Sequence, residues 1–189
     1  MLQLAYPLTE TVEIDGKVYE LDMSFDNILR LLDMLNDEEL DDATQVNLGI
    51  EMLIGEQLKN DMQTKEKILS EIFSETIGKD AKENVKRDIL GNPMPVTEEE
   101  KDNPFSFKQD GEYIYASFMQ DYGIDLIEQQ GKMHWNKFKA LLSGLRDDTK
   151  FKEVLKIRTT ELPSGKGTEK ERERLKKLKE IYKLKPEKG

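Results

Sequence analysis

The chain contains no cysteine, one histidine and one tryptophan among its 189 residues. The absence of cysteine excludes disulfides, thiolate catalysis and cysteine-ligated zinc. A single histidine, His134, leaves a metal site with one imidazole and a catalytic triad with one possible base. His134 precedes Trp135 on an apolar stripe, so we expect it to be a flanking surface residue. We expect no catalytic residue, no metal, no cofactor and no enzymatic activity.

Long hydrophobic runs are also missing. No stretch of about 18 apolar residues occurs, so we expect no membrane-spanning segment. The opening residues, MLQLAYPLTE, lack the basic region and apolar core of a secretory signal. The sequence therefore predicts a protein that stays in the cytoplasm of the cell that makes it.

Two short motifs resemble ligand sites but lack residues that those sites require. Ser164–Thr168 contains a Gly-Lys pair, but Thr160 stands where a phosphate loop needs glycine, and Gly167 follows the lysine. The acidic run Asp37–Asp42 lacks the spacing of a calcium loop. We interpret the first as a flexible joint and the second as a solvated turn.

Charge is abundant and unevenly distributed. Charged residues make up 36% of the chain, and the net charge is −10. Residues 1–110 carry 26 acidic and 11 basic side chains, whereas residues 111–189 carry 13 and 18. This balance indicates a well-solvated surface, and it also allows head-to-tail association or two unlike binding faces.

The N-terminal part predicts a β-hairpin followed by helices. Asp15-Gly16 separates two β-prone runs within Val12–Leu21, and a type I′ turn accepts this pair. Three helical stripes follow, with Ser24 and Thr64 as expected caps and Asp42–Gln45 as an expected capping box. Their apolar positions are Phe25, Ile28, Leu29, Leu32 and Leu35; Val46, Ile50, Leu53, Ile54 and Leu58; and Ile68, Leu69, Ile72, Phe73 and Ile77.

Prolines and glycines that interrupt helices, together with changes in composition, divide the chain into four parts. Residues 1–90 hold the hairpin and acidic helices, ending in a helical piece at Val85–Leu90, and residues 91–112 form a linker with three prolines. Residues 113–162 form an aromatic-rich helical core, and residues 163–189 a charged helix and tail that begins with a capping box at Thr168–Glu171. The predicted fold is therefore mainly α: a helical bundle with a small N-terminal β-hairpin.

The segment 113–162 carries three helical stripes, which we expect to pack on one another. Gly123 and Gly131 are expected to end helices. The stripes comprise Tyr115, Phe118, Met119 and Tyr122; Trp135, Phe138, Leu141, Leu142 and Leu145; and Phe151, Val154 and Leu155. Packing in the core is the first interpretation of these residues. A partner-binding groove is the alternative, and its candidate residues are Tyr122, Trp135, Phe138 and Leu142.

The run DYGIDLIEQQGKMHWNKFKALLSGL at Asp121–Leu145, followed by Thr149–Lys152 and Ile157–Thr159, resembles the bacteriophage gp-fifteen protein family of tailed phages and prophages of Gram-positive bacteria. The Asp-Gly hairpin followed by Ser24–Arg30 is similar to the same family. The shared pattern consists of helix-packing residues and contains no catalytic signature.

Genes of this family typically lie between those of the major tail protein and the tape measure protein. The resemblance therefore implies a tail assembly chaperone in the host bacterial cytoplasm that keeps the tape measure protein soluble during tail tube assembly. Self-association and contact with the major tail protein are further expectations.

Two other functions remain open from the sequence. One is a structural tail or virion component, or a connector. The other is a regulatory or nucleic-acid-binding protein that uses the basic C-terminal helix. The interleaved charges of residues 166–188 favour a solvated helix over a nucleic-acid site.

Overall fold

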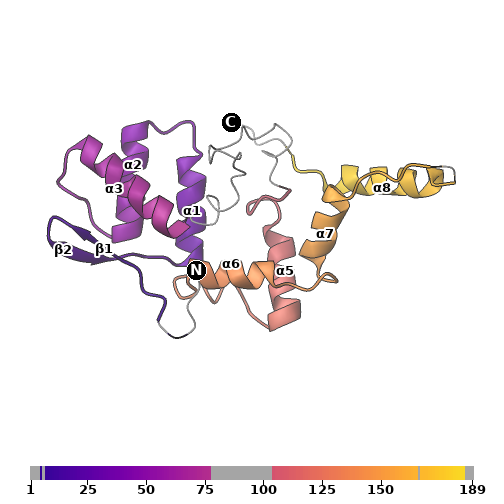
Figure 1. Cartoon of the computed structure of the whole chain (residues 1–189), viewed down its shortest axis with the longest axis horizontal. Coiled ribbons are helices and arrows are strands. Elements are labelled where there is room, and N and C mark those ends of the chain that lie inside the picture. The colour runs from indigo at the N-terminus through magenta and orange to yellow at the C-terminus, as the bar shows by residue number, and fades with distance from the viewer. Residues whose placement is uncertain (1–4, 6, 78–103, 166, 186–189) are drawn as a thin grey trace, which may run out of the picture. The chain divides into compact units, whose positions relative to one another are not determined.

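A computed structural model describes residues 5, 7–77, 104–165 and 167–185 (Figure 1). These residues are mainly helical, with one small antiparallel sheet, which confirms the predicted fold class. They belong to two compact units. The first holds the described residues up to 77 together with 130–140, and the second holds residues 104–129 and 141–185.

The first element is the predicted hairpin. Strand β1 (Thr11–Ile14) pairs antiparallel with β2 (Lys17–Glu20), with Val12 opposite Tyr19. Asp15 and Gly16 have φ values of 51° and 77°. Positive φ at both central residues is what a type I′ turn requires, so the Asp-Gly signal is confirmed.

The hairpin is held by contacts with the loop that follows the second helix. The Lys17 ammonium pairs with Glu56, and the Asn60 amide donates to Asp15 Oδ2 at 2.8 Å. Ile14 is buried on the inner face. Because an isolated hairpin is marginal in water, these contacts supply the support that it needs.

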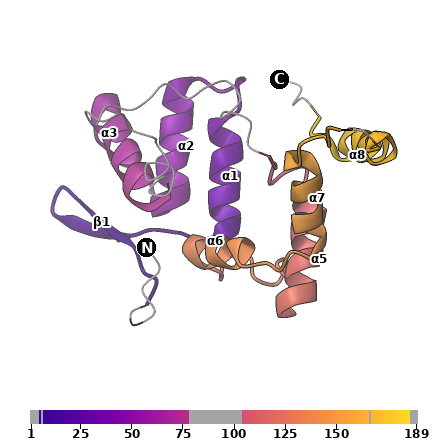
Figure 2. The ribbon, with the colours of Figure 1, turned by 45° about the vertical axis from the view of Figure 1, so that its right-hand side comes forward.

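Three helices pack beside the hairpin: α1 (Phe25–Leu35), α2 (Asp42–Ile54) and α3 (Met62–Ile72). They lie side by side (Figure 2), with α2 against both neighbours. Gly49 permits this close packing, because a Cβ there would lie 3.1 Å from a Leu69 methyl. Helix α3 continues as a π-helical turn, η1 (Phe73–Ile77).

The buried face of α1 is rotated relative to the predicted stripe. Phe25 and Ile28 are buried as expected, but Asn27 and Leu31 join them and the later leucines do not. The Asn27 amide donates to Met52 O at 2.7 Å and to Asp22 O at 3.0 Å. A buried amide with two carbonyl acceptors is satisfied, which explains how a polar residue occupies this face.

Two predicted caps do not form through their side chains. The Ser24 hydroxyl donates to Asp22 Oδ1 at 2.6 Å, and Ser24 makes no side-chain cap bond to α1. The Thr168 hydroxyl donates to Gly165 O at 2.9 Å, so the Thr168–Glu171 capping box is wrong. In both cases a nearby acceptor in the preceding loop captures the hydroxyl.

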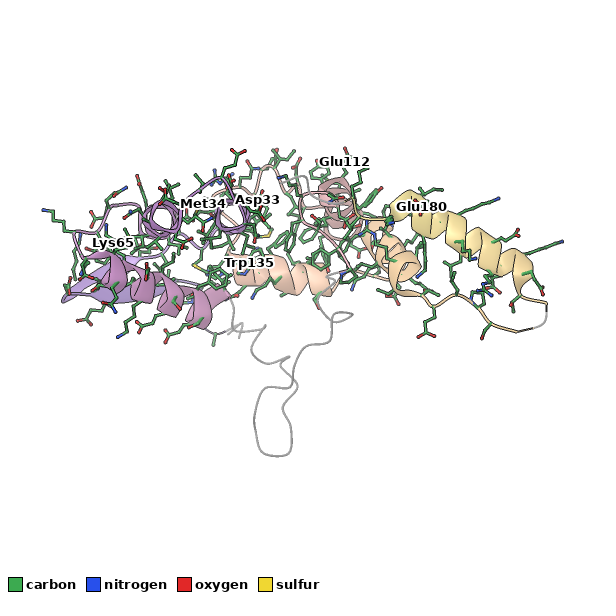
Figure 3. All side chains as sticks on the ribbon, turned by 90° about the horizontal axis from the view of Figure 1, so that it is seen from above. Asp33, Met34, Lys65, Glu112, Trp135 and Glu180 are labelled. Carbon is green, nitrogen blue, oxygen red and sulfur yellow. The ribbon has the colours of Figure 1, made fainter. Side chains whose placement is uncertain are left out.

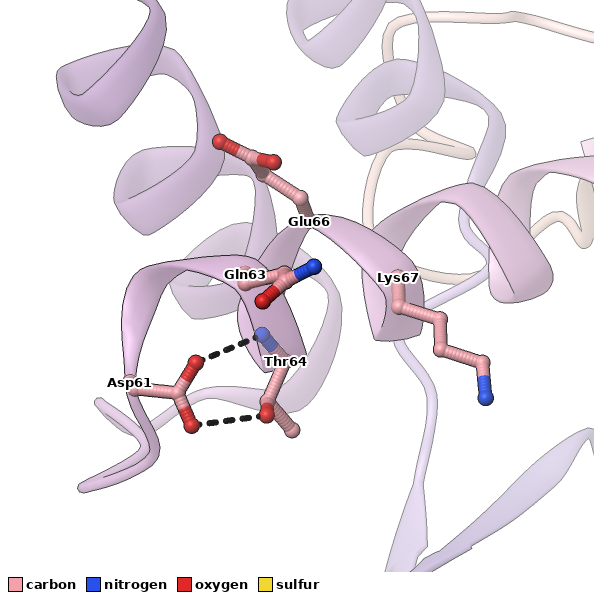
Figure 4. Close-up of a pocket in the computed structure, with 5 residues that line it drawn as sticks. All are labelled: Asp61, Gln63, Thr64, Glu66 and Lys67. Carbon is pink, nitrogen blue, oxygen red and sulfur yellow. Dashed lines mark hydrogen bonds between the residues drawn. The ribbon is translucent and has the colours of Figure 1, made fainter.

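The caps of α2 and α3 are aspartates that precede the predicted positions. The Asp41 carboxylate, and not Asp42, accepts from Thr44 N at 3.0 Å. Asp61 accepts both the backbone N–H and the hydroxyl of Thr64, at 3.0 and 2.8 Å (Figure 4). These bonds, the backbone one foremost, hold the pKa of the Asp61 carboxyl below its ordinary value. Thr64 is thus a donor to the cap and not the cap itself.

The second unit is built from α5 (Gly111–Tyr122), α7 (Lys150–Thr159) and α8 (Glu169–Tyr182). Helix α7 packs against both α5 and α8. Helix α5 ends at Gly123, whose φ of 62° confirms the predicted left-handed end. The linker predicted at 91–112 is described only from residue 104, and the helical piece expected at 85–90 lies outside the described residues.

The aromatic-rich segment 113–162 is divided between the two units. Helix α6 (Trp135–Ser143) belongs to the first unit up to Ala140. The Phe138 ring stacks on Phe25 with centroids 4.9 Å apart, and Trp135, at the start of α6 (Figure 3), stacks on Phe138 at 5.6 Å. All three rings are buried. The expected single core is therefore two cores, and Trp135 completes the first.

Replacing Phe138 should show how much this stack contributes. We expect Phe138→Ala to lower the free energy of unfolding of the first unit by about 3–5 kcal/mol, because it removes a fully buried ring between two others. Fluorescence of Trp135, the only tryptophan, reports on this unit during urea denaturation. Val18→Ala, at an exposed site, is the control. An unchanged midpoint for Phe138→Ala would contradict the assignment of this stack as core.

Candidate partner-binding surface

The four predicted partner-binding residues are not brought together in one unit. Trp135 and Phe138 lie in the first unit, and Tyr122 and Leu142 lie in the second. The Tyr122 hydroxyl donates to Leu141 O at 2.9 Å, and burial raises its pKa. Trp135, Phe138 and Leu142 are buried. Their burial favours the packing interpretation, and partner binding through them stays a prediction.

Large apolar side chains are exposed at other positions. Their exposed fractions are 62% for Val18, 37% for Leu48, 40% for Met119, 65% for Ile127 and 71% for Ile181. The prediction for Met119 is wrong, because its helical stripe predicted a buried position and the side chain is exposed. The sequence did carry a signal for Val18, because alternation along β2 places it opposite Glu13, on the face away from Ile14.

The depression at the start of α3 (Figure 4) lacks the features of a ligand-binding site. It is lined by Asp61, Gln63, Thr64, Glu66 and Lys67. The Asp61 carboxylate is occupied by its cap bonds. Within the described residues, no group of three or more histidine, aspartate or glutamate side chains could hold a metal ion.

His134 is one of the residues that line a second depression, and it is not the surface residue expected. Its side chain is 12% exposed, and its backbone forms a bridge with Ser24. Asn136 N donates to His134 Nδ1 at 3.1 Å, while the buried Nε2 has no hydrogen-bond partner among the described residues and lies 4.0 Å from Glu10 Oε1. Burial lowers the His134 pKa and Lys139 adds to this, whereas Glu10 opposes it.

This environment predicts a pH dependence of stability. A histidine whose folded pKa lies below its unfolded value stabilises the fold above about pH 6.5, and that stability is lost as pH falls through the folded pKa. We expect the urea midpoint followed by Trp135 fluorescence to fall between about pH 7.5 and 5. His134→Gln should fall less over the same range. Equal slopes for the two proteins would contradict a depressed His134 pKa.

The second unit contains a buried ion pair. Arg158 donates in bidentate fashion to Asp110, with Nη1–Oδ2 and Nη2–Oδ1 distances of 2.6 and 2.7 Å. The two side chains are 11% and 1% exposed. Arg158 also donates to Pro104 O at 3.0 Å and to Tyr182 O at 2.6 Å. One guanidinium therefore joins α5, α7, the end of α8 and the segment before α5.

The C-terminal end of α8 is further fixed by Tyr182. Lys150 Nζ donates to the Tyr182 hydroxyl at 2.8 Å and lies 4.7 Å from the centre of that ring. The Tyr113 ring meets Tyr182 edge-on at 6.1 Å. These contacts attach α8 to α5 and α7 through its last turn.

Removing the arginine should destabilise the second unit strongly. Arg158→Met leaves the Asp110 carboxylate buried without its cation, and breaking one side of such a pair costs about 3–5 kcal/mol. Hydrogen exchange of amides in α5 and α7 would measure the loss. Arg172→Met, at an exposed position on α8, is the control. Unchanged protection in Arg158→Met would show that the pair is dispensable.

The protein is mainly helical and exposes apolar side chains on both compact units. Among the described residues, no helix is long and apolar enough to cross a membrane. The chain belongs to the family described as Bacteriophage Gp15 protein, which matches residues 4–184. It is therefore a bacteriophage protein of structural or assembly type. No significant match was found among curated proteins or solved structures.

Proposed function

We propose that this protein is a non-enzymatic tail assembly chaperone. In the cytoplasm of the bacterial host, it binds the tape measure protein and keeps it soluble while the tail tube assembles. The observation that carries the proposal is the match to a phage structural or assembly family over residues 4–184. The distribution of apolar and charged surface supports it.

The contact with the tape measure is assigned to exposed apolar residues of the second unit. Met119 lies on the last turn of α5, and Ile127 lies in the turn that follows, between Asp125 and Glu128. A tape measure exposes long amphipathic helices, and covering their apolar faces removes a cause of aggregation. The net charge of −10 keeps the covered complex dispersed.

Coexpression of the tape measure with this chain tests the proposal. We expect the amount of soluble tape measure protein to rise when the chain is coexpressed. With Met119→Lys/Ile127→Lys this amount should fall about tenfold or more, because both apolar contacts with the tape measure are lost. Gln63→Lys/Gln130→Lys is the matched control, since it adds the same charge at exposed polar positions.

Equal insolubility of the tape measure with and without the chain would reject the chaperone role. Mass spectrometry of purified virions separates the structural alternative. An assembly factor is absent from mature particles, whereas a structural tail component is present in stoichiometric amount.

A further inference from the structure

Helix α8 separates its side chains by type around its axis. Leu175 and Leu178 share the side that carries Tyr182, through which α8 contacts α7. A second side contains Lys170, Arg174, Lys177 and Ile181, at spacings of i, i+4, i+7 and i+11. We call these four residues the basic face.

The basic face is open to solvent. All four of its side chains are exposed, and Ile181 is the most exposed large apolar residue among those described. Across the described part of the chain, none of the three cations forms an ion pair. Three unpaired cations beside an uncovered isoleucine form a surface suited to an acidic partner that also offers an apolar side chain.

Such a surface exists on α2 of the same chain. Leu48 and Glu51 share one exposed side of α2, and the N-cap residue Asp41, seven positions before Leu48, lies at the start of the helix. The exposed Asp41 carboxylate accepts two hydrogen bonds from Thr44 and keeps its negative charge, which those bonds leave available to a cation. We call these three residues the acidic face. The acidic turn Asp37–Asp42 extends it beyond the helix start. Residues 7–77 as a whole carry 18 acidic and 5 basic side chains, so the surrounding field is also negative.

The two faces match in register. Arg174 precedes Ile181 by seven residues, and Asp41 precedes Leu48 by seven. Seven residues span about two helical turns, or roughly 10 Å, in both helices. A parallel alignment with Ile181 on Leu48 therefore brings Arg174 level with Asp41. The same alignment carries Lys170 towards the acidic turn.

We propose that the basic face of α8 in one copy docks in parallel on the acidic face of α2 in a second copy. The contact buries Ile181 against Leu48, and cations meet carboxylates on its N-terminal side. Because the two faces differ, the contact is heterologous, and a bound pair still presents one free acidic face and one free basic face. Association therefore continues beyond a dimer.

Sedimentation velocity of the full chain over a concentration series tests this contact. At about 0.05 M salt we expect the mean mass to rise beyond a dimer with concentration. At about 0.5 M the rise should shrink, because salt screens the charge pairs. Ile181→Glu and Leu48→Lys should each weaken association about tenfold or more, through a lost apolar contact and an unpaired charge.

Combining Ile181→Glu and Leu48→Lys in one chain should restore association, because opposite charges then meet across the contact between copies. Ile127→Glu, an exposed apolar residue outside both faces, is the control and should associate as the unmodified chain does. Circular dichroism checks that each variant keeps its helix content.

A chain that stays monomeric at all concentrations would overturn the proposal. So would association that neither single variant weakens, or a double variant that remains as weak as the single ones. The contact between copies goes beyond the proposed chaperone function, and the experiments distinguish failure of one proposal from failure of the other. Self-association is measured by sedimentation, and the solubility of the tape measure is measured separately by coexpression. Ile127 variants should change only the solubility of the tape measure.

Discussion

Two backbone hydrogen bonds attach residues 130–140 to the start of α1, and the first unit depends on them. Phe25 N donates to Met133 O at 2.9 Å, and Trp135 N donates to Met23 O at 2.7 Å. Since Ser24 makes no side-chain cap bond, this distant carbonyl satisfies an N–H group that a helix start leaves open. The same bonds place Trp135 and Phe138 over Phe25. A segment more than 100 residues away in sequence thereby completes both the helix start and its core.

This return of the chain makes both units discontinuous in sequence. Helices α5 and α7 belong to the second unit, yet residues 130–140 between them belong to the first. Contacts in the second unit must therefore close long loops, and the Asp110–Arg158 pair joins residues 48 apart. Loop closure costs conformational entropy before such contacts form. A bidentate pair with two further carbonyl acceptors offsets part of that cost and fixes one arrangement of α5, α7 and α8.

Local signals in the sequence predicted turns and helices well. They misplaced helix caps, because a neighbouring residue competes for the capping bond, as Asp22 does at Ser24. They misjudged burial where distant segments decide it. The sequence predicts the positive φ at Asp15-Gly16 and Gly123 correctly, because positive φ is a property of one or two residues. Periodicity predicted the helices of 113–162, but it indicates that a helix has an apolar side without saying which helix covers it. For this reason the sequence predicts one core for Trp135 and Phe118, whereas the structure places them in two. The sequence carries no signal for the burial of Asn27, because its two carbonyl acceptors come from different segments.

The candidate surface was harder to predict for a related physical reason. Met119 follows Phe118 on a regular stripe, and only the arrangement of its neighbours leaves it exposed while Phe118 is fully buried. The exposed apolar residues are spread over α2, the hairpin, α5, the turn after it and α8. Each offers little burial alone, so a small ligand would gain little from them. A long helical partner could contact several such positions, and several weak contacts held on one chain combine through effective concentration. Scattered apolar residues on a strongly charged surface are thus better suited to an extended partner, or to repeated copies along one, than to a compact ligand.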